Sequence, residues 1–189
     1  MPLLDHFGLL APFYERFIPL RQPEKLIELA GLPDAGPLLD AGGGTGRVAK
    51  ALRGLASQVV VADISFGMLR QATVKDGLRP VCSHTEALPF PDEAFTRIIM
   101  VDALHHVCSQ VETAAELWRL LQPGGKIVIE EPDIGTLAVK AVAVMEKLAL
   151  MRSHFLGPDQ IAALFPYPDA RSSIQREGFN AWIIVEKLS

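Results

Sequence analysis

The sequence predicts an α/β fold in which helices cover both faces of a doubly wound, mostly parallel sheet, and an antiparallel hairpin ends the chain. Three observations predict this fold. Apolar runs rich in Val and Ile alternate with helical patterns of about a dozen residues. A glycine-rich loop follows the first apolar run. Near the end of the chain, residues 172–175 and 181–187 flank REGFN, which is typical of a hairpin turn.

The individual elements follow from periodicity and from helix-stopping residues. Prolines at 12 and 19 delimit a short helix over 13–18, and a second helix over 23–30 ends at Gly31. Strands are predicted over 37–41, 58–62, 79–83, 95–101 and 126–130, with helices through 48–55, 68–72 and 111–121. The strands are apolar throughout, which indicates a parallel sheet buried on both faces. Right-handed crossovers between them predict a Rossmann-like core of five parallel strands.

Composition excludes several classes of protein. Of the 189 residues, 49% are hydrophobic and 21% charged, as in a packed domain rather than a disordered chain. The formal net charge is -4 and no basic stripe is present, so we expect no nucleic-acid partner. Two cysteines are too few for a disulfide framework. The chain begins without a signal-peptide pattern and lacks an apolar run long enough to span a membrane, so a cytoplasmic location is expected.

The glycine-rich loop is the first candidate binding feature. Residues 38–50 read LLDAGGGTGRVAK, so four glycines follow a strand and precede a helix. Such a loop lets a ligand approach the backbone closely, near helix N–H groups that can bind an anion. Arg47 stands where the dinucleotide fingerprint requires its third glycine, which disfavours NAD(P).

Asp63 is the second candidate binding feature. It ends the second strand and lies 23 residues after Asp40. A carboxylate at about this spacing accepts hydrogen bonds from ribose hydroxyl groups in nucleotide-binding α/β proteins. The alternative is that Asp63 only caps the helix that starts near Ser65.

With these features in place, the sequence resembles the class I S-adenosylmethionine-dependent methyltransferases, in particular the small-molecule group that includes ubiquinone/menaquinone-biosynthesis enzymes. The resemblance covers residues 36–131 and rests on LLDAGGGTGR, VVVADIS, EALPFPDEAF, IIMVDALHHV and LQPGGKIVIEEPD, in the order found in the family. It implies S-adenosyl-L-methionine as cofactor, S-adenosyl-L-homocysteine as product, and in-line methyl transfer to a small-molecule acceptor.

The resemblance also implies roles for individual residues. The methionine part of the cofactor would lie at the glycine loop, the ribose at Asp63 and the adenine beyond it. At His84 the family usually has an acidic residue that accepts a hydrogen bond from the adenine amino group, so we expect pH-sensitive cofactor binding here. The residues implied to bind the cofactor are Asp40, Gly42, Gly44, Gly46, Asp63, Ile64, Met68, His84, Thr85, Asp102 and Ala103.

A general base is needed only when the acceptor atom must lose a proton. His105 and His106 are the candidate catalytic residues, because imidazole titrates near neutral pH. The alternative is that the pair only packs after the fourth strand. Other candidate bases are His6, Glu130 and Glu131. No metal site is expected, because Cys82 and His84 follow the third strand, which should not neighbour the fourth.

We expect the chain to form a single domain over 1–189. Residues 1–31 would form a helical lid, 36–131 the cofactor-binding core, and 132–189 an acceptor-side helix and the closing hairpin. The expected partner is a small-molecule acceptor, and a homo-oligomer is left open. The alternative function is a catalytically silent cofactor-binding or partner-activating domain on the same fold.

Overall fold

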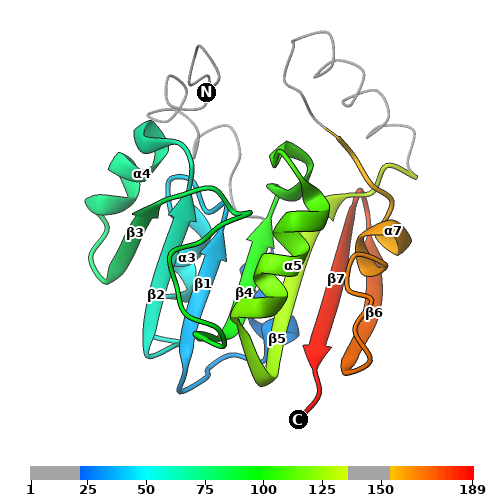
Figure 1. The fold of residues 1–189 in the computed structure, drawn as a ribbon. Helices are drawn as coiled ribbons and strands as arrows, with labels where there is room; N and C mark the ends of the chain where they lie inside the picture. Colours follow the sequence, from blue (N-terminus) through cyan, green and yellow to red (C-terminus); the bar gives the residue numbers. More distant parts are fainter. Residues whose placement is uncertain (1–21, 136–153) are drawn as a thin grey trace, which may run out of the picture.

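The computed structural model describes residues 22–135 and 154–189. Within these ranges the chain forms a seven-stranded sheet with the order β3-β2-β1-β4-β5-β7-β6 (Figure 1). The predicted helix over 13–18 lies outside the described residues, as does most of the segment predicted to form the acceptor-side helix.

Five strands run parallel and two close the sheet in the antiparallel sense. The parallel strands are β1 (Pro37–Ala41), β2 (Gln58–Asp63), β3 (Leu78–Cys82), β4 (Phe95–Val101) and β5 (Leu121–Pro132). The hairpin is β6 (Ala170–Glu177) and β7 (Asn180–Lys187), and β7 pairs antiparallel with β5. The predicted parallel core with a C-terminal hairpin is therefore confirmed.

The helices begin and end at residues that suit those positions. α2 (Pro23–Ala30) starts with a proline and ends at Gly31, whose φ of 64° places it in the left-handed region. The hydroxyl groups of Ser65 and Ser109 cap the next two long helices, α4 (Phe66–Thr73) and α5 (Gln110–Leu120). The shorter helices are α3 (Arg47–Leu52), η1 (Leu104–His106) and α7 (Pro158–Ala162).

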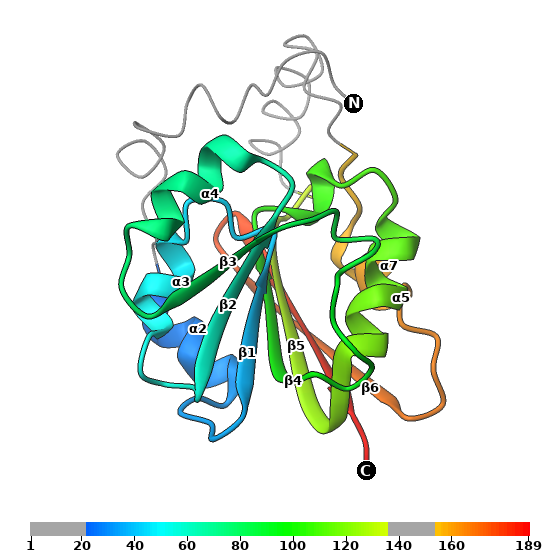
Figure 2. The same cartoon turned by 60° about the vertical axis from the view of Figure 1, so that its left-hand side comes forward.

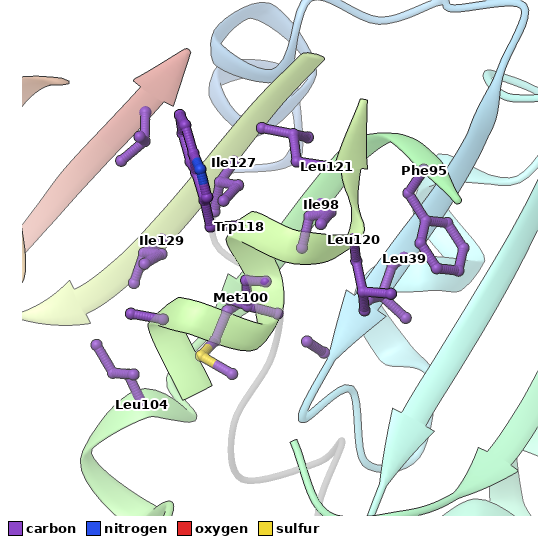
Figure 3. Packing of buried hydrophobic residues seen from close by; sticks show 14 of the residues in the cluster. Leu39, Phe95, Ile98, Met100, Leu104, Trp118, Leu120, Leu121, Ile127 and Ile129 are labelled. Atoms are coloured by element: carbon purple, nitrogen blue, oxygen red, sulfur yellow. The ribbon is translucent and has the colours of Figure 1, made fainter. Parts of the chain in front are cut away.

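The sheet separates two hydrophobic clusters because successive strand residues point to opposite faces. Leu38 packs on the face covered by α2 and α3, whereas the next residue, Leu39, packs on the face covered by α5 and α7. Figure 2 shows these two helical layers on either side of the sheet. Figure 3 shows side chains of β4, β5 and α5 that fill the second cluster.

The observed elements differ from the predicted ones at several boundaries. β5 begins at Leu121 rather than at 126, because Leu121 pairs with Phe95 before the register shifts. Residues 122–125 (QPGG) therefore form an irregular part of this strand. α3 ends at Leu52 rather than reaching Leu55. α2, which falls within the predicted lid, packs against the sheet through the fully buried Leu26.

Among the described residues, none of the helices combines the length and the apolar character needed to cross a membrane.

Candidate active site

The candidate site lies at the carboxyl ends of the parallel strands. The sheet order reverses between β1 and β4, and ligands bind at such a reversal in open α/β sheets. The glycine loop follows β1, Asp63 ends β2, and Asp102 follows β4. Because parallel strands place their carboxyl ends at one edge, most of the predicted cofactor residues come together there (Figure 1).

The glycine loop is packed too tightly to accept side chains. Gly42 has a φ of 71°, and a Cβ atom added to it would lie 2.6 Å from the Cβ of Ala103. A Cβ atom on Gly43 would lie 2.6 Å from the Cγ of Asp40. The loop therefore holds the end of β1 against the end of β4, and a group bound there meets bare backbone.

Asp63 links the glycine loop to the start of α4. Its Oδ2 accepts the N–H of Gly44 at 2.9 Å, and its Oδ1 accepts the N–H of Ser65 at 2.7 Å. The side chain that caps α4 is that of Ser65, whose hydroxyl oxygen accepts the N–H of Met68. Capping is therefore the role of Ser65, and the Asp63 carboxylate lies beside the loop.

The predicted adenine-side residues differ in exposure. Ile64 is 51% exposed next to Asp63, whereas Met68 is buried with its methyl group beneath Gly44. His84 is exposed, and its Nδ1 lies 3.7 Å from a carboxylate oxygen of Glu86. Thr85 is buried and its hydroxyl group pairs with that of Thr113.

Asp40 on β1 and Glu130 on β5 are buried carboxyl groups near the carboxyl ends of their strands. Burial raises the pKa of Asp40 to about 7, although the N–H of Ala49 and the charge of Arg47 act in the opposite direction. Burial and nearby Asp102 raise the pKa of Glu130 to about 7 as well. Glu130 accepts a hydrogen bond of 2.6 Å from the amide of Asn180.

Arg47 joins the glycine loop to the end of β4. It is the first residue of α3, and its guanidinium group lies 3.3 Å from Oδ2 of Asp102. Asp102 itself has a φ of 52°, an uncommon value for a residue other than glycine. Its backbone N–H is held by the carbonyl oxygen of Glu130 at 2.9 Å.

Glu131 and His105 form a buried pair beside this turn. Glu131 is 3% exposed, and its Oε1 accepts the backbone N–H groups of Ala103 and Leu104 at 3.0 and 2.7 Å. Its Oε2 lies 2.5 Å from Nδ1 of His105. The ring of His105 stacks on Phe155, with 4.4 Å between the ring centroids.

The two adjacent histidines have different surroundings. Burial, with a smaller contribution from His105, lowers the pKa of His106 to about 3. His106 therefore stays neutral at physiological pH, whereas a carboxylate faces His105. A cavity of about 440 Å³ adjoins Phe155, and it is lined by Val107, Cys108, Gln110, His154, Phe155 and Leu156.

Sequence reasoning missed the contacts of Arg47 and Asn180. In the sequence, Arg47 was noted only because it replaces the third glycine of the dinucleotide fingerprint. Nothing in the hairpin sequence indicates that the Asn180 side chain donates to Glu130. The strand order places β3 and β4 apart, as expected. Among residues 22–135 and 154–189, no three His, Cys, Asp or Glu side chains form a group that could hold a metal ion.

Comparison with known proteins agrees with this geometry. The family model described as "Methyltransferase domain" matches residues 39–129. A ubiquinone/menaquinone biosynthesis C-methyltransferase, UbiE, of Coxiella burnetii is 32% identical over 163 residues, which cover 71% of this chain and 65% of that protein. The UbiE protein of Saccharophagus degradans is 36% identical over 115 residues, covering 56% and 46%. The chain thus spans less than two thirds of the length of these curated relatives.

Solved structures share the fold at low sequence identity. A SAM-dependent methyltransferase of Aquifex aeolicus superposes with a TM-score of 0.69 at 16% identity, over 96% of this chain and 97% of that one. The YcgJ protein of Bacillus subtilis superposes with a TM-score of 0.74 at 20% identity, over 82% and 70%. These superpositions cover most of this chain, so the similarity of fold is not limited to the residues of the candidate site.

Proposed function

We propose that this chain is a class I S-adenosylmethionine-dependent methyltransferase, which binds S-adenosylmethionine at the glycine loop and transfers the methyl group to a small-molecule acceptor. The observation that carries the proposal is the position of the Asp63 carboxylate, which lies beside bare glycine backbone where the strand order reverses. Both oxygens of a carboxylate accept hydrogen bonds, which suits the hydroxyl donors of a ribose.

The residues at the site fit this cofactor. Gly42 and Gly44 carry no side chain, so a ligand at the loop would meet backbone, and the exposed Ile64 offers an apolar surface to a flat ring. Asp63 would accept hydrogen bonds from the ribose. His84 would face the adenine, and Asp102 and Ala103 would border the sulfonium. The remaining residues of the proposed cofactor site are Asp40, Gly46, Met68 and Thr85.

When bound, S-adenosylmethionine supplies a methyl group that its sulfonium already activates, so the protein contributes mainly position and alignment, worth about 7–11 kcal/mol. His105 is the proposed proton acceptor for an acceptor molecule that must lose a proton, because the carboxylate of Glu131 faces its ring. His106 suits this role less, because its lowered pKa opposes holding a proton.

The acceptor belongs to the proposal as well. The names of the matched relatives support an acceptor from ubiquinone or menaquinone biosynthesis, although this chain spans only part of those proteins. The cavity beside Phe155 supports an acceptor with apolar surface, since part of its lining is apolar.

The test combines binding with transfer. We expect S-adenosylhomocysteine to raise the melting temperature and to bind in calorimetry, and NADH to do neither. Stabilisation by NADH alone would overturn the proposal. Labelled methyl groups should pass from S-adenosylmethionine to 1,4-naphthoquinol or to a member of a small-metabolite panel. Cofactor binding without transfer to any acceptor would instead support a catalytically silent domain.

A further inference from the structure

We propose that Glu86 is a positioning residue, which fastens the loop after β3 to the start of α5 and so fixes where His84 and Thr85 lie at the adenine end of the cofactor site. This inference rests on the proposed function, because it concerns one end of the same site. It starts from a single side chain that joins two segments. The carboxylate of Glu86 contacts its own loop and also the backbone N–H groups of Cys108 and Ser109.

The loop between β3 and β4 is held by side chains rather than by the sheet. Residues 83–94 all lie in the described part of the chain, and they form neither helix nor strand. β3 is an edge strand, and β2 and β1 separate it from β4. Figures 1 and 2 show the loop crossing the face of the sheet that α5 covers. Its position therefore depends on side-chain contacts with α5.

Glu86 uses its two carboxylate oxygens for two different segments. Oε1 accepts the N–H groups of Cys108 and Ser109 at 2.8 and 3.0 Å, immediately before α5. Oε2 accepts the hydroxyl group of Thr85 at 3.4 Å and lies 3.7 Å from Nδ1 of His84. The Glu86 side chain is 12% exposed, so water competes little for these contacts. Hydrogen bonds to a charged acceptor are also stronger than those between neutral groups.

Two side chains of α5 hold the same loop farther along. The hydroxyl group of Thr113 lies 3.2 Å from that of Thr85, and Glu116 accepts the N–H of Leu88 at 2.8 Å. Glu116 therefore fastens the middle of the loop, whereas Glu86 fastens its beginning, where the proposed adenine residues lie. This difference separates the role of Glu86 from a general role in holding the loop on α5.

Glu86 also joins the two sides of the proposed site. On one side are the proposed adenine residues of its own loop. On the other side, Cys108 lines the cavity beside Phe155, where the acceptor is proposed to bind. A cofactor that orders the loop around Glu86 would therefore also order the cavity wall at Cys108. Such a link is reciprocal, so an acceptor in the cavity would favour cofactor binding to the same degree.

Three variants separate positioning from loop stability. Glu86→Ala removes the contacts to both segments. Glu86→Gln keeps an oxygen for the N–H groups of Cys108 and Ser109 but loses the charge, so its effects should be smaller. The matched control is Glu116→Ala, because Glu116 fastens the same loop to the same helix and otherwise contacts Arg119. Circular dichroism shows which variants fold, and Glu86→Gln replaces Glu86→Ala if the alanine variant does not.

The first measurement is amide hydrogen exchange at Cys108 and Ser109, followed by nuclear magnetic resonance. Without ligand, we expect Glu86→Ala to speed this exchange about 10-fold or more, as for the loss of a hydrogen bond to a charged group, and Glu116→Ala to leave it unchanged. S-adenosylhomocysteine should slow it in the wild type but not in Glu86→Ala. Unchanged exchange in Glu86→Ala, or no slowing by ligand bound to the wild type, would overturn the proposal.

The second measurement is calorimetry with S-adenosylhomocysteine and with S-inosylhomocysteine, in which a carbonyl oxygen replaces the adenine amino group. The wild type should bind the adenosyl compound several times more tightly. We expect this ratio to shrink severalfold in Glu86→Ala, because His84 is no longer held beside the amino group, and to persist in Glu116→Ala. A merely structural role would weaken both ligands equally.

The possible outcomes distinguish this inference from the proposed function. An affinity ratio that is the same in the wild type and in Glu86→Ala would overturn the inference while the proposed function stands. So would an equal decrease of the ratio in Glu86→Ala and Glu116→Ala, because the effect would then belong to the loop as a whole. Failure of the wild type to bind S-adenosylhomocysteine would overturn the proposed function itself, and this inference with it.

Discussion

The Asp63 carboxylate holds Gly44 in place, since its Oδ2 accepts the Gly44 N–H at 2.9 Å. This bond joins the end of β2 to the loop that follows β1, and a second bond from Ser65 fixes the other carboxylate oxygen. The residue proposed to bind the ribose thus also orders the loop proposed to bind the methionine part of the cofactor.

Asp63→Ala should therefore weaken S-adenosylhomocysteine binding by at least about 1 kcal/mol, or roughly fivefold, because a charge-assisted hydrogen bond is lost. Isothermal calorimetry measures this change. The control is Asp76→Ala, which removes an exposed carboxylate beyond the other end of α4. If both variants bind as tightly as the wild type, Asp63 has no role in the ribose site.

The contact between Gly42 and Ala103 predicts a specific loss of stability. Gly42→Ala would combine left-handed strain of about 1–2 kcal/mol with a clash against the Cβ of Ala103, which adds about 1–3 kcal/mol. Gly54→Ala is the matched control, because Gly54 has a φ of 82° but no atom within 4 Å of the added Cβ. Urea denaturation measures the free energy of unfolding of both variants. Equal losses would show that the clash with Ala103 adds no destabilisation.

The raised pKa of Asp40 predicts a pH-dependent effect of Asp40→Asn. Between about pH 4 and 7 the folded protein keeps a proton on Asp40 that the unfolded chain has lost, so this group makes the wild type less stable as pH rises. Asparagine does not titrate. The melting temperature of Asp40→Asn relative to wild type should therefore increase from pH 4.5 to 7.5 and level off above.

Asp34 offers a control with the opposite sign. Burial raises its pKa, but the hydroxyl of Thr96, the N–H of Gly36 and the charge of Arg97 together lower it overall. Its stabilising contribution is complete above the pKa of the unfolded chain and is lost only as the pH falls further. Asp34→Asn should thus lower the melting temperature by a similar amount at pH 4.5 and 7.5. The two pKa directions would be contradicted if the melting-temperature difference from wild type changed with pH for Asp34→Asn and stayed constant for Asp40→Asn.

His84 predicts the strength of cofactor binding. One nitrogen of an imidazole can accept a hydrogen bond from the adenine amino group, which an alanine side chain cannot do. His84→Ala should therefore bind S-adenosylhomocysteine several times more weakly than wild type. Calorimetry measures this. An unchanged affinity would show that residue 84 does not contact the base.

The sequence predicted the parts of the fold that depend on local pattern. The apolar strands and the glycine loop are visible in single segments, and β4 was predicted over its observed range, Phe95–Val101. The start of β5 was missed because the bonds that extend it to Leu121 come from β4, not from its own sequence. The helices η1 and α7 are too short for a periodic signal.

The candidate site was predictable as a list of residues but not as a set of contacts. Asp63 and the glycines stand at recognisable strand ends. The pairing of Glu131 with His105 depends on β4 and β5 lying side by side, which brings together residues 26 positions apart. The burial that lowers the pKa of His106 also arises only in the folded chain.

The position of β7 in the sheet has a consequence for how the chain folds during synthesis. β7 lies between β5 and β6, and its Asn180 supplies a hydrogen bond to Glu130. During synthesis, the ribosome would release the first five strands before the one that covers β5. Until then β5 would have an unpaired edge beside fully buried Val128 and Ile129, and a nascent chain stalled at this stage would be open to aggregation.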